Sequence, residues 1–495
     1  MNLIPFYPLV LTQCITSCTL SAHRTKDSPN VLIIQTDEHN FRTLGCYRKL
    51  LPENQGYVWG RGINVETPNI DFLGQNGVIF TKFYASTPLS SPSRASFVSG
   101  RYPQYTGVTT NDVPMDGNIV SFAEVLRQNG YATGYAGKWH LDGQGRPQWA
   151  PERKFGFTDN RYMFNRGHWK KLAITANGPE VASAGKNGVP NYNLNGADEH
   201  SFTTDFLTER AIEFMKQNDP KTTGKPFCYM ISIPDPHDPD LVRPPYDTMY
   251  QGLPFEAPVS YNIPEENVPG WAKRDIECSI DQTQYFGMIK CIDDNVGKIL
   301  QYLKDNNLIN KTIVVFTSDH GDMRSEHHRQ NKGIPFEASA KVPFIVYYPA
   351  KIKAGSVVKN TFSTVDFAPS ILKLAGLDYP VSMQGRDFSP LMEKPENQTA
   401  WEDISVIRSS GLTNKGNWIA VITSRYKLVL SRNNVPWLLD LEQDPFELTN
   451  HISIRGNKAV VKQMAAKLQE YKLKYDDPFL KETRMEADLI RLLAE

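Results

Sequence analysis

The chain carries no net charge, because its 54 basic residues balance 54 acidic ones. It also has no low-complexity tract. A neutral overall field argues against a nucleic-acid or membrane-surface binder, since both functions need an excess of positive charge. An anionic ligand would have to be held by a local cluster of cations. The length of 495 residues suits one large α/β domain with a smaller one, or two or three average domains.

No hydrophobic run is long enough to span a membrane. The longest apolar stretch near the start, residues 3–11, is typical of the core of a secretory signal, although a basic leader is missing. We therefore expect residues 1–22 to be a signal peptide and the protein to be secreted or periplasmic. Residues 15–18, ITSC, loosely match a lipoprotein box. A lipid anchor on Cys18 at the cell surface is thus an equal alternative to a simple cleaved signal.

The cysteines follow no metal-binding or disulfide pattern. Two of the six lie before residue 19, and the other four are scattered without a CxxC spacing. We expect those four to be buried thiols rather than a zinc site or a disulfide framework. The nucleophile motif GxSxG is also missing, which argues against the serine-hydrolase elbow.

What the sequence does contain is a repeated design, in which an apolar, β-rich run precedes a loop with reactive side chains. The strands are expected at residues 31–34, 78–84, 132–136, 227–233 and 312–316. Segments with a helical apolar period lie between them, at residues 121–130, 205–218 and 284–307. Alternating strands and helices predict a large, mostly parallel or mixed sheet between two layers of helices. Ligands bind such sheets beyond the carboxyl ends of the strands, so the loops are expected to converge.

The pattern changes near residue 395, where short strands separated by turns replace the long alternation. An amphipathic helix over residues 458–477 follows them. We therefore expect a main domain over residues 28–395 and a smaller subdomain over residues 396–495. The subdomain should contain an antiparallel sheet with a packed helix.

Two pairs of possible metal ligands follow two of the strands. They are Asp37 with Glu38, and Asp319 with His320. Carboxylates from two loops suit a hard cation such as Ca2+ or Mg2+, and the histidine leaves Mn2+ or Zn2+ open. Taken alone, each pair is more typical of solvated loop residues than of a metal site.

Five cationic or titratable side chains also lie in or near the strand-end loops: Arg94, Lys138, His140, His237 and Lys332. A tetrahedral oxyanion such as sulfate or phosphate needs several such donors. Ser90 and Ser91 precede a short helical segment that begins near Pro92, where free backbone N–H groups favour an anion. A serine there needs a base or a metal before it can act as a nucleophile.

At this point the residues resemble a known family. Ser90, Ser91, Pro92, Ser93 and Arg94, with Thr106 and Gly107 further on, resemble the first sulfatase signature. Residues 137–140, GKWH, resemble the second signature, and residues 314–323, VVFTSDHGDM, resemble the C-terminal metal motif. The similarity spans about residues 30–450. It implies an alkaline-phosphatase-type α/β catalytic domain with a smaller C-terminal subdomain.

The resemblance implies that Ser90 is oxidised to formylglycine (3-oxoalanine) by an anaerobic maturating enzyme. The hydrated aldehyde would attack sulfur with one hydroxyl and expel sulfate by deprotonation of the other. The metal, usually Ca2+ with Mg2+ or Mn2+ as alternatives, would be held by Asp37, Glu38, Asp319, His320 and the modified Ser90. The other implied roles are orientation of the nucleophile for Arg94, sulfate binding for Lys138 and Lys332, proton acceptance for His140 and proton donation for His237.

Two departures from the family pattern leave alternatives open. Glu38 stands where aspartate is common, and His320 stands where asparagine is frequent, so the metal is less defined. The histidine keeps a phosphodiesterase or phosphonate monoester hydrolase open. A non-catalytic glycan-binding relative, in which Ser90 stays unmodified, is the third hypothesis.

The basic, aromatic segment of residues 160–172 bears on the substrate. Its side chains Arg166, His168 and Lys170 are expected to bind an anionic sugar, although a structural insertion with a solvated basic face explains the same residues. The leading expectation is a sulfuric ester hydrolase that acts on sulfated saccharides.

Overall fold

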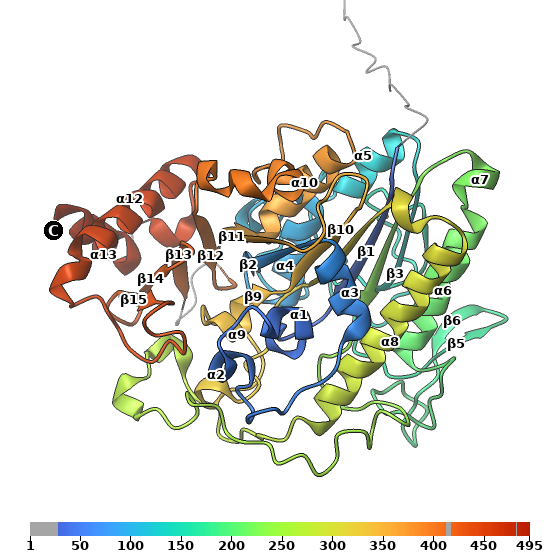
Figure 1. Cartoon of the computed structure of the whole chain (residues 1–495), viewed down its shortest axis with the longest axis horizontal. Helices are drawn as coiled ribbons and strands as arrows, with labels where there is room; N and C mark the ends of the chain where they lie inside the picture. Colours follow the sequence, from blue (N-terminus) through green and yellow to red (C-terminus); the bar gives the residue numbers. More distant parts are fainter. Residues whose placement is uncertain (1–27, 412–416, 482) are drawn as a thin grey trace, which may run out of the picture.

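The computed structural model describes residues 28–411, 417–481 and 483–495 (Figure 1). The expected signal peptide and Cys18 lie outside these residues. In the described part of the chain, no helix is both long and apolar enough to cross a membrane.

A nine-stranded sheet forms the centre of the main domain. β1 (Asn30–Thr36) lies between β7 (Phe227–Ile233) and β8 (Thr312–Ser318) and runs parallel to both. The sheet continues beyond β7 with β3 (Ala132–Lys138) and β4 (Asp159–Phe164), again in parallel.

On the other side, β10 (Phe344–Tyr347) is antiparallel to β8 and to β2 (Val78–Tyr84). The sheet ends with β11 (Ser356–Ser363), parallel to β2, and the short β9 (Lys341–Val342) pairs with β2 in antiparallel fashion. The five strands expected from the sequence are thus all present and all point the same way. Their carboxyl ends meet at one edge of the sheet, which confirms the expected fold class.

Helices cover both faces of this sheet (Figure 1). The core on one face contains residues of α4 (Ser90–Ser99), α5 (Phe122–Gln128) and α10 (Phe367–Leu374). The core on the other face contains residues of α3 (Pro68–Asn76), α6 (Thr203–Gln217) and α8 (Thr283–Asp305). Strand β1 shows why both faces are buried, because its alternate apolar side chains belong to the two cores in turn.

The smaller elements of the main domain lie in the connections between these strands and helices. They are α1 (Gly45–Arg48), α2 (Glu53–Gly56), α7 (Pro220–Thr223), α9 (Glu337–Ala340), α11 (Ser389–Glu393) and the hairpin of β5 (Leu172–Thr175) and β6 (Gly178–Val181). Cys46, Cys228 and Cys291 are buried free thiols as expected, while Cys278 is half-buried and also unpaired.

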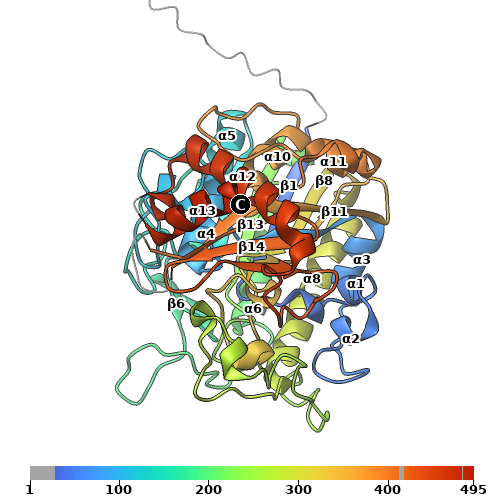
Figure 2. The same ribbon diagram turned by 90° about the vertical axis from the view of Figure 1, so that its left-hand side faces the viewer.

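The C-terminal part forms a second, four-stranded antiparallel sheet. Its strands, in order, are β12 (Ser405–Arg408), β13 (Trp418–Ile422), β14 (Tyr426–Ser431) and β15 (Trp437–Asp440). α12 (Lys458–Tyr475) and α13 (Arg484–Ala494) pack on one face of this sheet (Figure 2). The other face packs against Trp271 and Phe336. The antiparallel sheet and the first helix agree with the sequence, whereas α13 was not anticipated.

Candidate active site

Ser90 lies at the edge of the main sheet where the strands end. The sequence suggested a position just before a helix, but Ser90 is itself the first residue of α4, with Leu89 as the N-cap. Its side chain is buried, and its Oγ lies 3.0 Å from Nε2 of His320. The next backbone N–H, of Ser91, donates to the side chain of Asn111 at 3.0 Å. At the start of α4, the side chain of Ser90 and the backbone N–H of Ser91 therefore each have a defined partner.

Arg94 lies one turn further along α4 and is surrounded by hydrogen-bond acceptors. It donates to the carboxylates of Asp319 at 2.8 Å and Asp37 at 3.2 Å. It also donates to the backbone carbonyl of Lys138 and the hydroxyl of Ser232. Burial lowers the pKa of Arg94, but the two carboxylates outweigh burial and raise it. The guanidinium is thus a permanent, immobile cation beside Ser90.

The acidic side chains come from the ends of β1 and β8. Nε2 of His320 lies 3.6 Å from Oδ1 of Asp37 and 3.6 Å from Oδ1 of Asp319. Oδ1 of Asp319 also accepts the backbone N–H groups of Glu38 at 3.2 Å and His320 at 2.8 Å. Glu38 has a left-handed backbone with a φ of 65°, which is costly for a residue with a side chain. This strained turn sends the consecutive side chains of Asp37 and Glu38, which follow β1, into the same site.

The donor set fits a divalent cation. Oδ1 of Asp37 and Oε1 of Glu38 are buried, and neither has a hydrogen-bond partner among the described residues. Buried carboxylate oxygens rarely stay without a partner, because desolvation costs several kcal/mol, about 2–7 for a polar group. Asp37, Asp319 and His320 each offer a ligand atom, and these atoms lie within 4.8 Å of one another. An oxygen-rich set with one histidine is compatible with Ca2+, Mg2+ or Mn2+.

Two lysines meet these carboxylates. The ammonium of Lys138 pairs with Oδ2 of Asp37 at 2.5 Å, and that of Lys332 pairs with Oε2 of Glu38 at 2.8 Å. Burial lowers the pKa of Lys138 despite the pull of Asp37. For Asp37, burial is the largest effect and raises the pKa, but the surrounding positive charges, led by Lys138 and Arg94, together lower it, so the carboxylate stays charged. The site therefore carries fixed charges of both signs at close range.

His140 follows β3 and also has a left-handed backbone, with a φ of 61°. Its Nε2 lies 2.9 Å from Oδ1 of Asp112, and its buried Nδ1 has no hydrogen-bond partner among the described residues. Burial lowers the pKa of His140 to about 4, although Asp112 opposes this shift. At neutral pH the imidazole is therefore uncharged and able to accept a proton.

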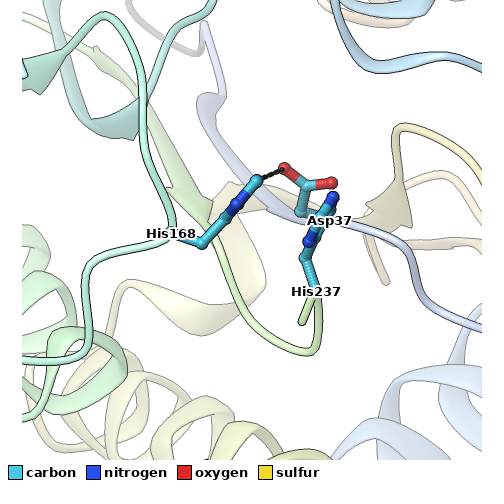
Figure 3. A group of neighbouring side chains, drawn as sticks. All are labelled: Asp37, His168 and His237. Carbon is cyan, nitrogen blue, oxygen red and sulfur yellow. Dashed lines mark ion pairs between the residues drawn. The ribbon is translucent and has the colours of Figure 1, made fainter. Parts of the chain in front are cut away.

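His237 and His168 stack on each other beside Asp37 (Figure 3). Their ring centroids are 3.6 Å apart, and Nε2 of His168 lies 3.9 Å from Oδ2 of Asp37. Nε2 of His168 also lies 2.7 Å from the ammonium of Lys138. Burial, followed by the charge of His237, lowers the pKa of His168, so it is a neutral acceptor for Lys138. His168 therefore orients a lysine of the site.

His237 has the opposite electrostatic environment. Its Nε2 lies 3.0 Å from Oε2 of Glu38 and 2.7 Å from the ammonium of Lys332. Burial lowers the pKa of His237, but the carboxylates of Glu38 and Asp238 together outweigh this effect and raise the pKa to about 9. The two histidines of the stack thus differ in charge, because only one faces a carboxylate at short range.

The basic side chains that follow β4 differ in exposure, because one lies at the rim of the site and another is buried below it. Arg166 is partly exposed and pairs with Oδ2 of Asp112 at 2.9 Å. Lys170 is fully buried, pairs with Asp235 at 2.7 Å and lies 3.4 Å from the carbonyl oxygen of His237. Lys170 supports the loop that carries His237 and has no free donor for a substrate, in contrast to the expectation from the sequence.

Sequence reasoning missed several partners of the site. Ser232 and Gln35 hold Arg94 from inside strands β7 and β1, and a polar residue in an apolar strand was the only signal for them. Asp112 connects His140 with Arg166, and nothing in its local sequence pointed to that role.

Comparisons with known proteins agree with this geometry. The family described as Sulfatase matches residues 29–377, and the family described as N-sulphoglucosamine sulphohydrolase, C-terminal, matches residues 325–474. An N-acetylglucosamine-6-O-sulfatase of Bacteroides thetaiotaomicron is 25% identical and covers 95% of this chain and 91% of its own length. An ulvan-active sulfatase of Formosa agariphila is 27% identical and covers 95% of this chain and 87% of its own length.

A solved structure has the same fold. It was determined in complex with its substrate D-glucosamine-2-N,6-O-disulfate, and it superposes with a TM-score of 0.74 at 22% identity. The superposition covers 92% of this chain and 100% of the other chain.

Proposed function

This chain belongs to the sulfatase family and is a sulfuric ester hydrolase, and from that premise we propose that its substrate is a sulfated carbohydrate. The observation that carries the proposal is the convergence at Ser90. Its hydroxyl lies 3.0 Å from His320, and the cations and acids of the site follow the ends of β1, β3, β7 and β8 at the same edge of the sheet. A sulfate group, with its charged oxygens, matches such an arrangement of fixed donors.

We propose that Ser90 acts as formylglycine. A plain serine would form a stable sulfate ester and stop there, whereas a hydrated aldehyde keeps a second hydroxyl whose deprotonation breaks the C–O bond to sulfate. The signature from Ser90 to Arg94 supports this modification, as does the burial of Ser90 at the start of α4. We further propose that an anaerobic maturating enzyme carries out the oxidation.

We propose that Asp37, Glu38, Asp319 and His320 hold a divalent cation, with Ca2+ favoured by the oxygen-rich set. Such an ion would act as a Lewis acid for a sulfate oxygen and for the nucleophile. The buried oxygens of Asp37 and Glu38 without partners support it. Arg94 keeps its guanidinium against Asp37 and Asp319 and so fixes the carboxylates that face Ser90.

The remaining side chains divide the work between binding and proton transfer. Lys138 and Lys332 carry the charge that neutralises the sulfate oxygens, and His168 holds Lys138 in place. His140 is uncharged at neutral pH and accepts the proton whose loss releases sulfate. His237 donates a proton to the oxygen of the departing sugar. It lies beside Glu38 and Lys332, in the loop that follows β7.

The carbohydrate substrate rests on two supports. The similar proteins named above act on N-acetylglucosamine sulfate and on ulvan, or hold a glucosamine disulfate. In this chain Arg166 lies at the rim, where a sugar bearing the sulfate would project. A secreted or periplasmic location, with or without a lipid anchor, is part of the same proposal, because polymeric glycans are met outside the cytoplasm.

The test is hydrolysis by protein produced with a sulfatase-maturating enzyme. We expect release of sulfate from an aryl sulfate and from members of a panel of sulfated saccharides, with much slower release of phosphate from the matching aryl phosphate. Faster turnover of the aryl phosphate would favour the phosphodiesterase or phosphonate hydrolase alternative. No turnover of any sulfated saccharide, with turnover of aryl sulfate intact, would refute the carbohydrate substrate alone.

A further inference from the structure

One loop at the rim of the site is built around a single buried side chain. Asn165, at the end of β4, donates to the carbonyl oxygens of Gly143 at 2.9 Å and Gly145 at 3.0 Å. Its Oδ1 accepts the N–H of Asp142 at 2.9 Å, and its backbone carbonyl accepts the N–H of His140 at 2.6 Å. The loop that leads to Arg146 is thereby fixed to the same residue as His140.

Arg146 lies on this loop next to Arg166. The backbone N–H of Arg166 donates to the carbonyl of Pro147 at 3.3 Å, which holds the two arginine-bearing segments together. The guanidinium of Arg146 lies 4.9 Å from the ring centroid of Tyr192 and 5.5 Å from that of Trp169. These contacts hold the cation by its faces, in the manner of a cation–π pair.

The aromatic support is rigid. The Trp169 ring is buried, and its Nε1 donates to the carbonyl of Arg166 at 3.1 Å. A Cβ on Gly167 would lie 2.4 Å from this ring, and Gly167 has a φ of 121°, so only glycine fits there. Tyr192 packs against Trp169 with ring centroids 4.9 Å apart. Arg146 therefore rests on a preformed aromatic surface made by Trp169 and Tyr192. We call these three residues together the shelf.

The charge on this shelf is not balanced. Arg146 forms no ion pair and no hydrogen bond with its side chain among the described residues. Arg166 has one carboxylate, that of Asp112, and shares it with His140. Two guanidinium groups thus face one carboxylate at a partly exposed surface. Such an excess is unfavourable for the empty protein and is relieved by an anion.

The shelf adjoins the site of Ser90 through two chains of contacts. One runs from Arg166 through Asp112 to His140. The other runs from Tyr192 to His168, whose rings are 5.8 Å apart, and from His168 to Lys138. Both chains end on residues that we assign to sulfate binding or proton transfer. The shelf and the residues around Ser90 therefore belong to one connected set of side chains.

We propose that Arg146 and Arg166, with Tyr192 as a stacking surface, form a second anion subsite that binds a carboxylate or a second sulfate on the saccharide. This inference rests on the proposed function and defines its substrate class as sugars with at least two anionic groups. A guanidinium fork pairs with either oxyanion in two parallel hydrogen bonds, and a tyrosine ring offers a flat surface to a pyranose. A neutral sugar would leave the two arginines without a partner.

The first test compares kcat/KM for three sulfated disaccharides that differ in one group: a uronate carboxylate, a second sulfate, or neither. We expect the wild-type enzyme to prefer the two dianionic compounds by about 10- to 100-fold, the range for a hydrogen bond to a charged group. Arg146→Ala should remove most of this preference, and Arg146→Lys should restore part of it. The exposed arginine of the Arg161–Asp159 pair supplies the control, Arg161→Ala, which should keep the preference.

The second test is binding, which needs no turnover. Titration calorimetry of the inactive Ser90→Ala protein should give a Kd for each dianionic disaccharide about 10-fold or more below that for the monosulfated one, with the difference lost in Ser90→Ala/Arg146→Ala. Preference for only one dianionic compound identifies the anion as carboxylate or sulfate. Equal binding of all three, or a preference that survives Arg146→Ala, overturns the subsite. An enzyme that hydrolyses no sulfate ester but shows the Arg146-dependent binding difference would instead refute the proposed function and leave the subsite supported.

Discussion

The hydroxyl of Ser90 lies 3.0 Å from Nε2 of His320, although the two residues are 230 positions apart in the chain. Ser90 begins α4 after β2, and His320 follows β8. Between these two strands in the sheet lies only β10, so the ends of β2 and β8 are close enough for the side chains to meet. This single contact joins the signature segment to the acidic cluster and makes both parts of one site.

The first prediction concerns the nucleophile. Ser90→Ala should abolish hydrolysis, because among the described residues no other hydroxyl is hydrogen-bonded to Nε2 of His320. The melting temperature should change little, since the substitution removes one oxygen. Ser91→Ala is the matched control, because the neighbouring Oγ is buried and has no hydrogen-bond partner among the described residues. It should retain activity. Mass spectrometry of the wild-type peptide should show the loss of two hydrogens at Ser90, and substantial activity in Ser90→Ala would contradict the assignment.

The second prediction concerns the metal. A chelator should lower the melting temperature and the activity, and added Ca2+ should restore both, because an ion that binds only the folded state stabilises it by about 2.7 kcal/mol at a concentration 100 times Kd. Glu38→Gln should weaken this response, since it removes the charge of a side chain with an unpaired buried oxygen. Asp378→Asn, in an exposed ion pair, should respond like the wild type. A melting temperature that does not depend on any divalent cation would argue against the site.

The third prediction concerns pH. Burial lowers the pKa of His140 to about 4 from 6.5, with Lys138 and Arg94 adding to the shift and Asp112 opposing it. A base must be uncharged, so activity that depends on His140 is present above pH 4 and is lost as the pH falls through about 4. Asp112→Asn removes the carboxylate that raises this pKa. It should therefore move the acidic limb of the kcat profile to lower pH, because His140 acts in the release of sulfate, after the sugar has departed.

A control and a contrary outcome define the pH experiment. Asp159→Asn, at the first residue of β4 and in an ion pair with Arg161, should leave the acidic limb unchanged. A limb that moves to higher pH in Asp112→Asn would show that another group controls it.

The fourth prediction concerns the C-terminal sheet. Arg408 on β12 donates to both carboxylate oxygens of Asp477 at 2.9 Å, and both side chains are buried. Arg408→Ala should lower the free energy of unfolding by about 3–5 kcal/mol, because it leaves a buried charge without its partner. Arg61→Ala breaks an exposed ion pair with Glu53 and should cost about 0–1 kcal/mol. Urea unfolding measures both, and equal effects would contradict the argument.

The sheet was predictable because its signals are local. The apolar runs that became β2 and β7 have the bounds expected from the sequence, and β1, β3 and β8 extend the expected runs by one or two residues at an end. A strand that is buried on both faces must be apolar throughout, which is visible in any short window. The helix α13 was missed although its signal is also local, since its buried residues Met485, Leu489 and Leu492 recur at helical spacing after the N-cap Thr483.

The chemistry of the site was only partly predictable. Residue type and position after a strand pointed to Asp37, Glu38, Asp319 and His320. The structure places ligand atoms of Asp37, Asp319 and His320 within 4.8 Å of one another, while the carboxylate of Glu38 pairs with His237 and Lys332. Asp112 and Ser232 were missed, since their partners are distant in the chain. Arg146 was missed for the same reason, because its aromatic support comes from two other loops.

The sequence by itself determined the order of strands and helices, the residues at each strand end and the signature around Ser90, because these depend on neighbours within a few positions. Only the tertiary structure decided what each charged side chain can do. Lys138, Lys170 and Lys332 are the same residue type in similar loops, yet one pairs with Asp37, one is buried against Asp235 and one shares Glu38 with His237. Charge state and availability depend on desolvation and on the nearest opposite charge, and residues far apart in the chain supply both.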